Sequence, residues 1–147
     1  MNSRELCNNY LTEATATKED SNDRAVFNTY RNGGLSVFRT DNNDIDIDFT
    51  FSTDVNISGF GFYKEDNKNY ERYPQDVELY FKQDADYKLV SKEHYELVDS
   101  QLDMTTFYIL NNNRSTEWKI IIKGNWYTSS SRPEDFSFRD PYLAIKV

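Results

Sequence analysis

The sequence predicts an all-β domain, an antiparallel β-sandwich of the jelly-roll type with a short helical turn at its N-terminus. Apolar and polar residues alternate from Ile45 to Phe51, which gives a strand one dry face and one wet face. Roughly eight or nine short apolar runs follow one another at regular spacing, as in sandwiches and barrels. The chain has 11 Tyr and 10 Phe but only five Gly, a composition typical of strands packed face to face.

The 147 residues are predicted to form a single domain with a helical start and a polar lead-in. Residues 1–11 are expected to contain a short helix, because Ser3 can cap it and apolar side chains then share one face. Residues 12–34 are polar and weakly patterned, so we expect an extended lead-in that ends in a turn at 32–34, where Asn and two Gly tolerate positive φ. Residues 35–147 are predicted to form the sandwich core.

The best-patterned stretch spans residues 41–63 and is predicted to contain two successive strands of an antiparallel sheet. The polar triplet at 52–54 is expected to separate them. The dry side of the first strand is predicted to consist of Ile45, Ile47, Phe49 and Phe51. We expect this side to pack against a facing layer that includes Ile120 and Ile122.

Further strands are predicted from period-two runs along the rest of the chain. They are expected at residues 35–39, 76–82, 87–90, 95–98, 106–110, 118–123 and 143–147. In the run at 76–82, Val77, Leu79 and Phe81 are expected to point inward and Glu78 and Tyr80 outward. Residues 83–86 read as a hairpin turn. The run at 118–123 is the most apolar and is expected to be a central strand.

Charge and cysteine content exclude several classes of protein. The net charge of -8 disfavours nucleic acid or anionic lipid as a partner. Cys7 is the only cysteine, so an internal disulfide is excluded. No apolar run approaches the ~20 residues of a membrane span, and the N-terminus lacks the pattern of a secretion signal. We therefore expect a cytoplasmic location and no membrane insertion, unless the chain was excised from a larger secreted protein.

No catalytic residue is predicted. His94 and Cys7, the only residues of their kinds, cannot fill a tetrahedral zinc site, and His94 is expected on the surface or on an edge strand. Asp44, Asp46 and Asp48 share one strand face about 7 Å apart, near the carboxyl separation of an inverting glycosidase. The same spacing arises whenever Asp fills the wet side of a strand.

A calcium ion is the one cofactor that the residues favour. Residues 41–44 read Asp-Asn-Asn-Asp and cluster oxygen ligands in a turn, the ligand type that hard cations need. The expected ligands are Asp41 and Asp44. The default interpretation is a turn rich in Asp and Asn that holds no metal, so no cofactor is required and calcium is the additional possibility.

Several phrases resemble the discoidin-type, galactose-binding-like β-sandwich family. They read ISGFGFY, YPQDVELYFKQDADYKLV, WKIIIKGNW and PYLAIKV, and the resemblance covers about residues 12–147. It implies a sandwich that binds ligands, in which members often carry a structural calcium near the early strands. A weaker resemblance links residues 38–63 to the PHR domain of large ubiquitin ligases and BTB proteins, a β-sandwich that binds protein partners inside cells.

Aromatic and arginine residues in the predicted loops are the candidate ligand site. Exposed Trp and Tyr stack on sugars or anchor protein interfaces, and Arg adds a planar donor fork. The predicted site consists of Tyr30, Arg31, Tyr70, Arg72, Tyr73, Trp126, Tyr127 and Arg132. If successive strands run antiparallel, the turn at 40–44 and the loop at 64–75 emerge at the same end of the sandwich. Alternatively, Trp126 and Tyr127 fold back as a lid over the core.

We therefore predict a non-catalytic binding module that recognises a partner protein or a glycan through these loops. For a chain inside the cell, a protein partner is favoured over a sugar. One alternative is a small acidic inhibitor of a nucleic-acid-binding enzyme, whose carboxylates imitate phosphates. Another is a hydrolase with a carboxylate pair. The sequence leaves the ligand and the oligomeric state open.

Overall fold

The computed structural model of the chain describes residues 3–16, 35–39, 44–64, 74–95, 104–125 and 135–147. Within them lie one helix and eight strands. These are α1 (Ser3–Tyr10), β1 (Leu11–Ala16), β2 (Leu35–Arg39), β3 (Asp44–Lys64), β4 (Pro74–Gln83), β5 (Asp86–His94), β6 (Met104–Tyr108), β7 (Ser115–Asn125) and β8 (Asp135–Lys146).

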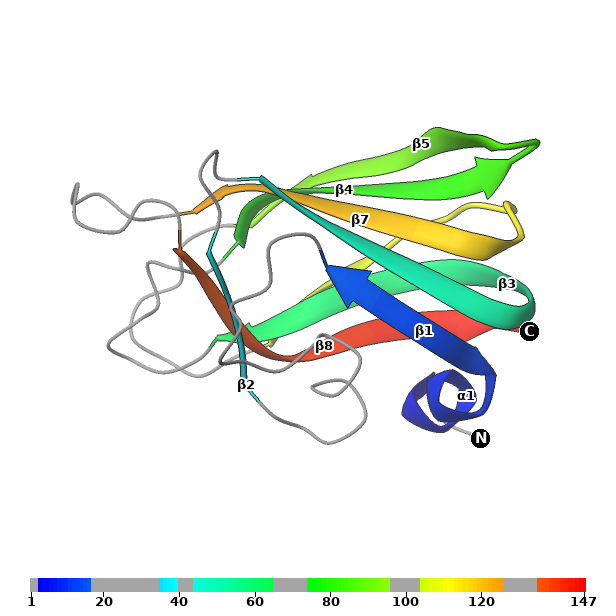
Figure 1. The fold of residues 1–147 in the computed structure, drawn as a ribbon, viewed down its shortest axis with the longest axis horizontal. Helices are drawn as coiled ribbons and strands as arrows, with labels where there is room; N and C mark the ends of the chain where they lie inside the picture. Colours follow the sequence, from blue (N-terminus) through cyan, green and yellow to red (C-terminus); the bar gives the residue numbers. More distant parts are fainter. Residues whose placement is uncertain (1–2, 17–34, 40–43, 65–73, 96–103, 126–134) are drawn as a thin grey trace.

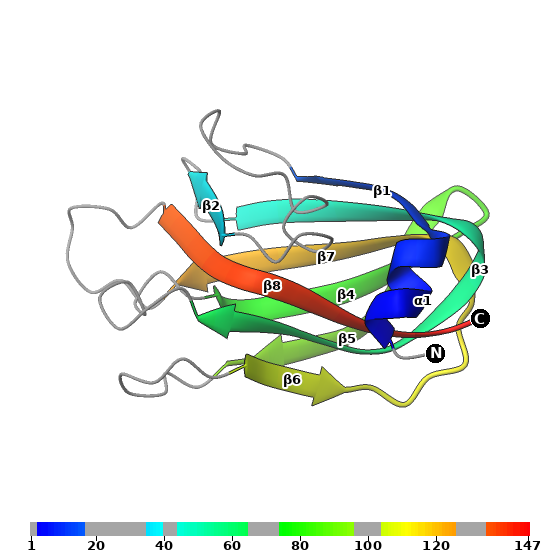
Figure 2. The same cartoon turned by 90° about the horizontal axis from the view of Figure 1, so that it is seen from below.

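The strands form two antiparallel layers that face each other, which confirms the predicted β-sandwich (Figures 1 and 2). The first layer has the order β1-β3-β7-β4-β5. The second has the order β2-β8-β3-β6. We call them the first and the second sheet. β3 belongs to both, so the two layers are joined by a continuous strand.

β3 turns the corner between the sheets near residues 52–54. Its first half, up to Thr50, pairs with β1 and β7, and its second half, from Asn56, pairs with β8 and β6. The pairing with β7 shifts register between Thr50 and Val55. The predicted break is therefore a bend within one strand, which returns so that both ends of β3 lie at the same end of the sandwich (Figure 1).

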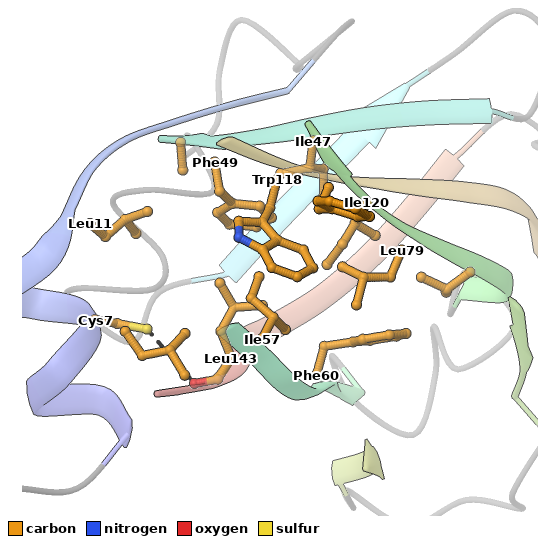
Figure 3. Packing of buried hydrophobic residues seen from close by; sticks show 14 of the residues in the cluster. Cys7, Leu11, Ile47, Phe49, Ile57, Phe60, Leu79, Trp118, Ile120 and Leu143 are labelled. Carbon is orange, nitrogen blue, oxygen red and sulfur yellow. Dashed lines mark hydrogen bonds between the residues drawn. The ribbon is translucent and has the colours of Figure 1, made fainter. Parts of the chain in front are cut away.

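The alternating residues of β3 fill the core as predicted. Ile45, Ile47, Phe49 and Phe51 are at most 3% exposed. The prediction that Ile120 and Ile122 lie in the facing layer is wrong. They pair with Ile47 and Ile45 in the same sheet, since alternation reveals which side of a strand is dry but not which layer holds it. The facing layer contributes Ile57, Phe60, Leu143 and Ile145 (Figure 3).

Trp118 of β7 lies at the centre of the core beside the bend of β3 (Figure 3). Its indole N–H donates to the carbonyl oxygens of Val55 at 3.2 Å and of Ser115 at 3.1 Å. Its ring lies 5.9 Å from that of Phe81 on β4. Since β7 lies between β3 and β4, the predicted central position of this strand is confirmed. The hydrogen bond to Val55 holds the bend against the first sheet.

The predicted hairpin turn between β4 and β5 is confirmed. Asp84 and Ala85 have φ values of 53° and 77°, the left-handed conformation that two-residue hairpin loops require. β5 then runs on to His94, further than the predicted run 87–90. Of the strand predicted at 95–98, only Tyr95 is described, and it follows β5 outside any strand.

The N-terminal helix is confirmed as α1, but the lead-in predicted for residues 12–34 is corrected at its start. Leu11–Ala16 is a strand of the first sheet, β1, paired with β3, because Leu11 and Ala14 place apolar groups in the core. Residues 17–34, with the predicted turn at 32–34, lie outside the described part of the chain. Helix α1 packs beside the last strand, and the buried thiol of Cys7 donates to the carbonyl oxygen of Leu143 at 3.7 Å.

We predict that Gly59→Ala destabilises the fold by about 1–3 kcal/mol, the usual cost of overpacking a core. A Cβ at Gly59 would lie 2.8 Å from the backbone oxygen of Phe107 on β6, which cannot move without disturbing the sheet. Urea unfolding followed by fluorescence measures the change. Lys88→Ala on β5 is the control and should stay within about 0.5 kcal/mol of the parent. If Gly59→Ala changed the free energy of unfolding as little as Lys88→Ala does, the result would contradict the close approach of β3 and β6.

Candidate functional site

Strand register gathers several chain segments at one end of the sandwich, which we call the loop end (left in Figure 1). Pro74, the first residue of β4, is the Cα partner of Asn125, the last residue of β7. Asp44, where β3 begins, pairs with Lys123 of the same strand β7. The segments 40–43, 65–73 and 126–134 are therefore attached to neighbouring strands at a common end.

All of the sequence-predicted ligand residues lie outside the described part of the chain. They are Tyr30, Arg31, Tyr70, Arg72, Tyr73, Trp126, Tyr127 and Arg132. The segments 65–73 and 126–134, which carry six of them, are attached to the paired residues Pro74 and Asn125. The segment 17–34 is attached at Ala16 and Leu35, which pair with β3 and β8. Register therefore pairs the attachment points of the first two segments directly. It also places those of the third near the same end, because Ala16 pairs with Ile47 and the partner of Leu35, Arg139, also pairs with Tyr63.

The calcium site stays a prediction. Asp41 lies outside the described residues, and so does the side chain of Asp44. Within the described ranges, no group of three or more His, Cys, Asp or Glu could hold a metal ion.

The Asp residues on the wet face of β3 take part in ion pairs. The ammonium of Lys119 on β7 lies 4.0 Å from a carboxylate oxygen of Asp46 and 3.6 Å from one of Asp48. The same ammonium lies 4.4 Å from the ring centroid of Tyr87 on β5. Burial, with the nearby charges of Asp48 and Glu117, raises the pKa of Tyr87. This is the ion-paired outer face of a sheet, and it weakens both the carboxylate-pair hydrolase and the phosphate-mimic hypotheses.

Glu78 is a charged residue whose environment the sequence did not reveal. The prediction that it points away from the core is consistent with its partners, yet only 7% of its surface is exposed. Its carboxylate accepts a hydrogen bond from the Tyr80 hydroxyl at 2.8 Å. It also pairs with the ammonium groups of Lys123 at 3.2 Å and Lys92 at 3.6 Å. These partners come from β4, β5 and β7, so only the register shows them.

Burial acts to raise the pKa of the Glu78 carboxyl, but its partners outweigh that effect. The hydrogen bond from Tyr80 and the ammonium of Lys123, with a smaller contribution from Lys92, lower the pKa below its ordinary value. Burial and the hydrogen bond to Glu78 raise the pKa of Tyr80. The carboxylate therefore stays ionised at neutral pH and links three strands near the loop end.

A hollow of about 270 Å³ on the outside of the first sheet adjoins Glu78. His94 lies at its rim on the edge strand β5, as predicted, with its Nδ1 2.6 Å from a carboxylate oxygen of Asp76. Acidic and basic side chains are intermixed around the hollow, since Glu93, Lys92 and Lys123 also line it. Three carboxylates and two ammonium groups line it, and Glu78 pairs with both ammonium groups, so the hollow offers no unpaired cluster of one sign for a charged ligand.

A larger cleft lies at the opposite end, between the segment 109–114 and the end of β8. Its floor is built on Asn56, which is only 6% exposed. The Asn56 amide donates to the carbonyl oxygens of Asn111 at 3.0 Å and Asn113 at 2.8 Å, and to the Asn111 side chain at 3.0 Å. The Asn111 amide in turn donates to the carbonyl oxygen of Ile57 at 2.9 Å. Sequence reasoning did not predict this cleft.

Comparison with known proteins identifies the fold. No protein-family model and no curated protein matches the sequence. A family 32 carbohydrate-binding module of Clostridium perfringens NanJ, solved with galactose, matches with a TM-score of 0.67 and 12% identity, covering 91% of this chain and 93% of that one. A second C. perfringens family 32 module, solved with GalNAc-β-1,3-galactose, matches with a TM-score of 0.66 and 14% identity, covering 89% and 93%.

A third solved structure, the family 32 module of Streptococcus pneumoniae EndoD, has a TM-score of 0.64 and 13% identity and covers 88% of this chain and 94% of its own. At such identities the likeness shows the fold and not the ligand. The discoidin-like, galactose-binding-like sandwich expected from the resemblance is thus confirmed. Among the helices of the described residues, none is long and apolar enough to cross a membrane.

We predict that Glu78→Gln lowers stability by about 1 kcal/mol at pH 7 and by less at acid pH. Because the folded-state pKa is depressed, the stabilisation is present above the ordinary value of 4.5 and is lost as the pH falls through the folded value. Urea unfolding of the parent and of Glu78→Gln at pH values from about 3 to about 7, a range that includes the titration of a glutamate carboxyl, tests this. The exposed Glu13→Gln variant is the control. A difference that does not change with pH would contradict the ionised Glu78 network.

Proposed function

We propose that this chain is a non-catalytic module that binds a glycan at the loop end of the sandwich. The observation that carries the proposal is the likeness to three carbohydrate-binding modules along nearly their whole length. The likeness extends over both sheets, so it includes the strands to which the predicted loops are attached. A glycan, rather than a partner protein, is the ligand class that this likeness supports.

The proposed ligand carries galactose or N-acetylgalactosamine. Two of the similar modules were solved with galactose or with GalNAc-β-1,3-galactose. The segments 65–73 and 126–134 supply the matching chemistry. The rings of Tyr70 and Trp126 offer apolar platforms for the C–H face of a sugar, and Arg72 offers N–H donors for its hydroxyl oxygens.

The described strands provide a rigid base for such a site. Pro74 and Asn125 are fixed by the pairing of β4 with β7, and Glu78 links these strands to β5. Binding loops on a rigid sandwich lose less entropy on binding than loops without support. The geometry of the attachment points thus supports a single site that draws on both segments.

Two sequence-based expectations stand apart from this proposal. The acidic-inhibitor hypothesis loses support because Lys119 already pairs with Asp46 and Asp48, which reduces the negative potential of that face. The cytoplasmic location and the structural calcium at Asp41 and Asp44 stay predictions.

We predict that the parent protein binds galactose- or GalNAc-terminated glycans on a glycan array. Tyr70→Ala and Trp126→Ala should each weaken binding at least about tenfold, the effect of losing roughly 1.4 kcal/mol of ring contact. Isothermal titration with the best glycan measures the affinities.

Tyr108→Ala is the matched control, because Tyr108 is an exposed tyrosine at the other end of the sandwich. This variant should bind galactose-type glycans as the parent does. Full binding by both Tyr70→Ala and Trp126→Ala would show that the predicted loops do not form the site. Absence of binding to any glycan would contradict the proposed ligand class.

A further inference from the structure

The cleft opposite the loop end has the size and lining of a ligand site. Its volume is about 550 Å³, within the usual range of small-molecule pockets. A hollow of about 210 Å³ adjoins it, and Asn56, Asn111, Asn112 and Lys146 line both. The two form a continuous depression beside the C-terminal end of β8, at the end of the molecule where Figure 2 marks the C-terminus.

The floor of the cleft is preorganised. The buried amide of Asn56 fixes the backbone of the segment 109–114 through its bonds to Asn111 and Asn113. The backbone N–H of Ile109 donates to the carbonyl oxygen of Ser58 at 2.8 Å, which attaches the start of the segment to β3. The segment 109–114 on one side of the cleft and the end of β8 on the other are both hydrogen-bonded to β3. Little ordering of the segment 109–114 is therefore needed when a ligand binds.

One half of the cleft is apolar and aromatic. Tyr108 is 78% exposed, and Leu110 is fully exposed. Tyr108 pairs with Gly59, and a Cβ built at Gly59 would lie only 3.4 Å from a carbon of the Tyr108 ring. The ring therefore lies against a glycine, which leaves the remainder of its surface open as a platform at the rim.

The other half is cationic. Lys146 lies at the end of β8 and Arg114 just before β7, and both are exposed. One N–H of the Arg114 guanidinium donates to the carbonyl oxygen of Asp54 at 3.0 Å, which orients the group and leaves its other N–H donors for a ligand. Within the described residues, no carboxylate pairs with Lys146.

The charge of this cleft is opposite to that of the chain as a whole. The protein carries 25 acidic against 17 basic residues, yet the described lining of the cleft and its adjoining hollow includes Arg114 and Lys146 and no Asp or Glu. Two cations at one depression match a carboxylate, which Arg can bind through two parallel hydrogen bonds. The Tyr108 platform matches a ring attached to that carboxylate.

We propose that the cleft is a second binding site, and that it takes a saccharide carrying a carboxylate. The sugar ring lies against Tyr108, and the carboxylate faces Lys146 and Arg114. Hexuronic and sialic acids share this chemistry. The proposal does not rest on the loop-end site, since the two sites lie at opposite ends of the sandwich and share no residue.

The test is a ¹⁵N NMR titration of the full chain with methyl β-glucuronide, methyl β-glucoside, N-acetylneuraminate and acetate. The glucuronide and the glucoside differ only in the carboxylate. We expect one or both acidic sugars to shift the amide signals of Asn112, Arg114 and Lys146. The glucoside and acetate should each bind at least about tenfold more weakly, because each lacks one of the two contacts.

Variants separate this site from the loop-end site. Lys146→Ala and Tyr108→Ala should each weaken acidic-sugar binding at least about tenfold. Lys88→Ala removes the same charge from an exposed position on β5 and should have no effect, and Trp126→Ala should leave acidic-sugar binding intact. The proposal is overturned if neither acidic sugar binds with a dissociation constant below about 10 mM. It is also overturned if the glucoside or acetate binds as tightly as the acidic sugars. Binding by Lys146→Ala and Tyr108→Ala with the affinity of the parent would overturn it as well.

Discussion

β3 is the element on which the rest of the structure depends, because it contributes to both layers and bends between them. Its first half pairs with β1 and β7 in the first sheet, and its second half pairs with β8 and β6 in the second. The Trp118 indole bonds to Val55, just beyond the bend, from the middle of the core. This fixes the bend, and the bend returns both ends of β3 to the loop end. Any ligand site built on those ends therefore depends on the packing around Trp118.

The sequence predicted the faces of the strands better than their layers. Period-two alternation identified the buried residues of β3, and the sequence at 83–86 marked the hairpin turn, in which the structure shows Asp84 and Ala85 with positive φ. Alternation is a local property, however, so it placed Ile120 in the wrong layer. It also could not reveal that Glu78 forms an ion pair with Lys123 of another strand. Both depend on register, which is set by pairing between residues far apart in the chain.

The two candidate sites differ in how much of them the sequence could reveal. The aromatic and arginine residues of 65–73 and 126–134 stood out by composition. Only the pairing of Pro74 with Asn125 shows that the first segment joins its strand beside the point where the second leaves its own. The opposite cleft left almost no local signal. It depends on bonds between Asn56 and Asn111, 55 positions apart, and on cations brought together by folding.

The most direct test of the central claim is a map of where a neutral galactoside binds. In a ¹⁵N NMR titration with methyl β-galactoside, we predict shifted amide signals for Lys64, Gln75 and Asn125, which border the loop end. The amides of Asn112 and Arg114 should stay unchanged. Shifts confined to the 109–114 segment, or none at concentrations up to about 100 mM, would contradict a glycan site at the loop end.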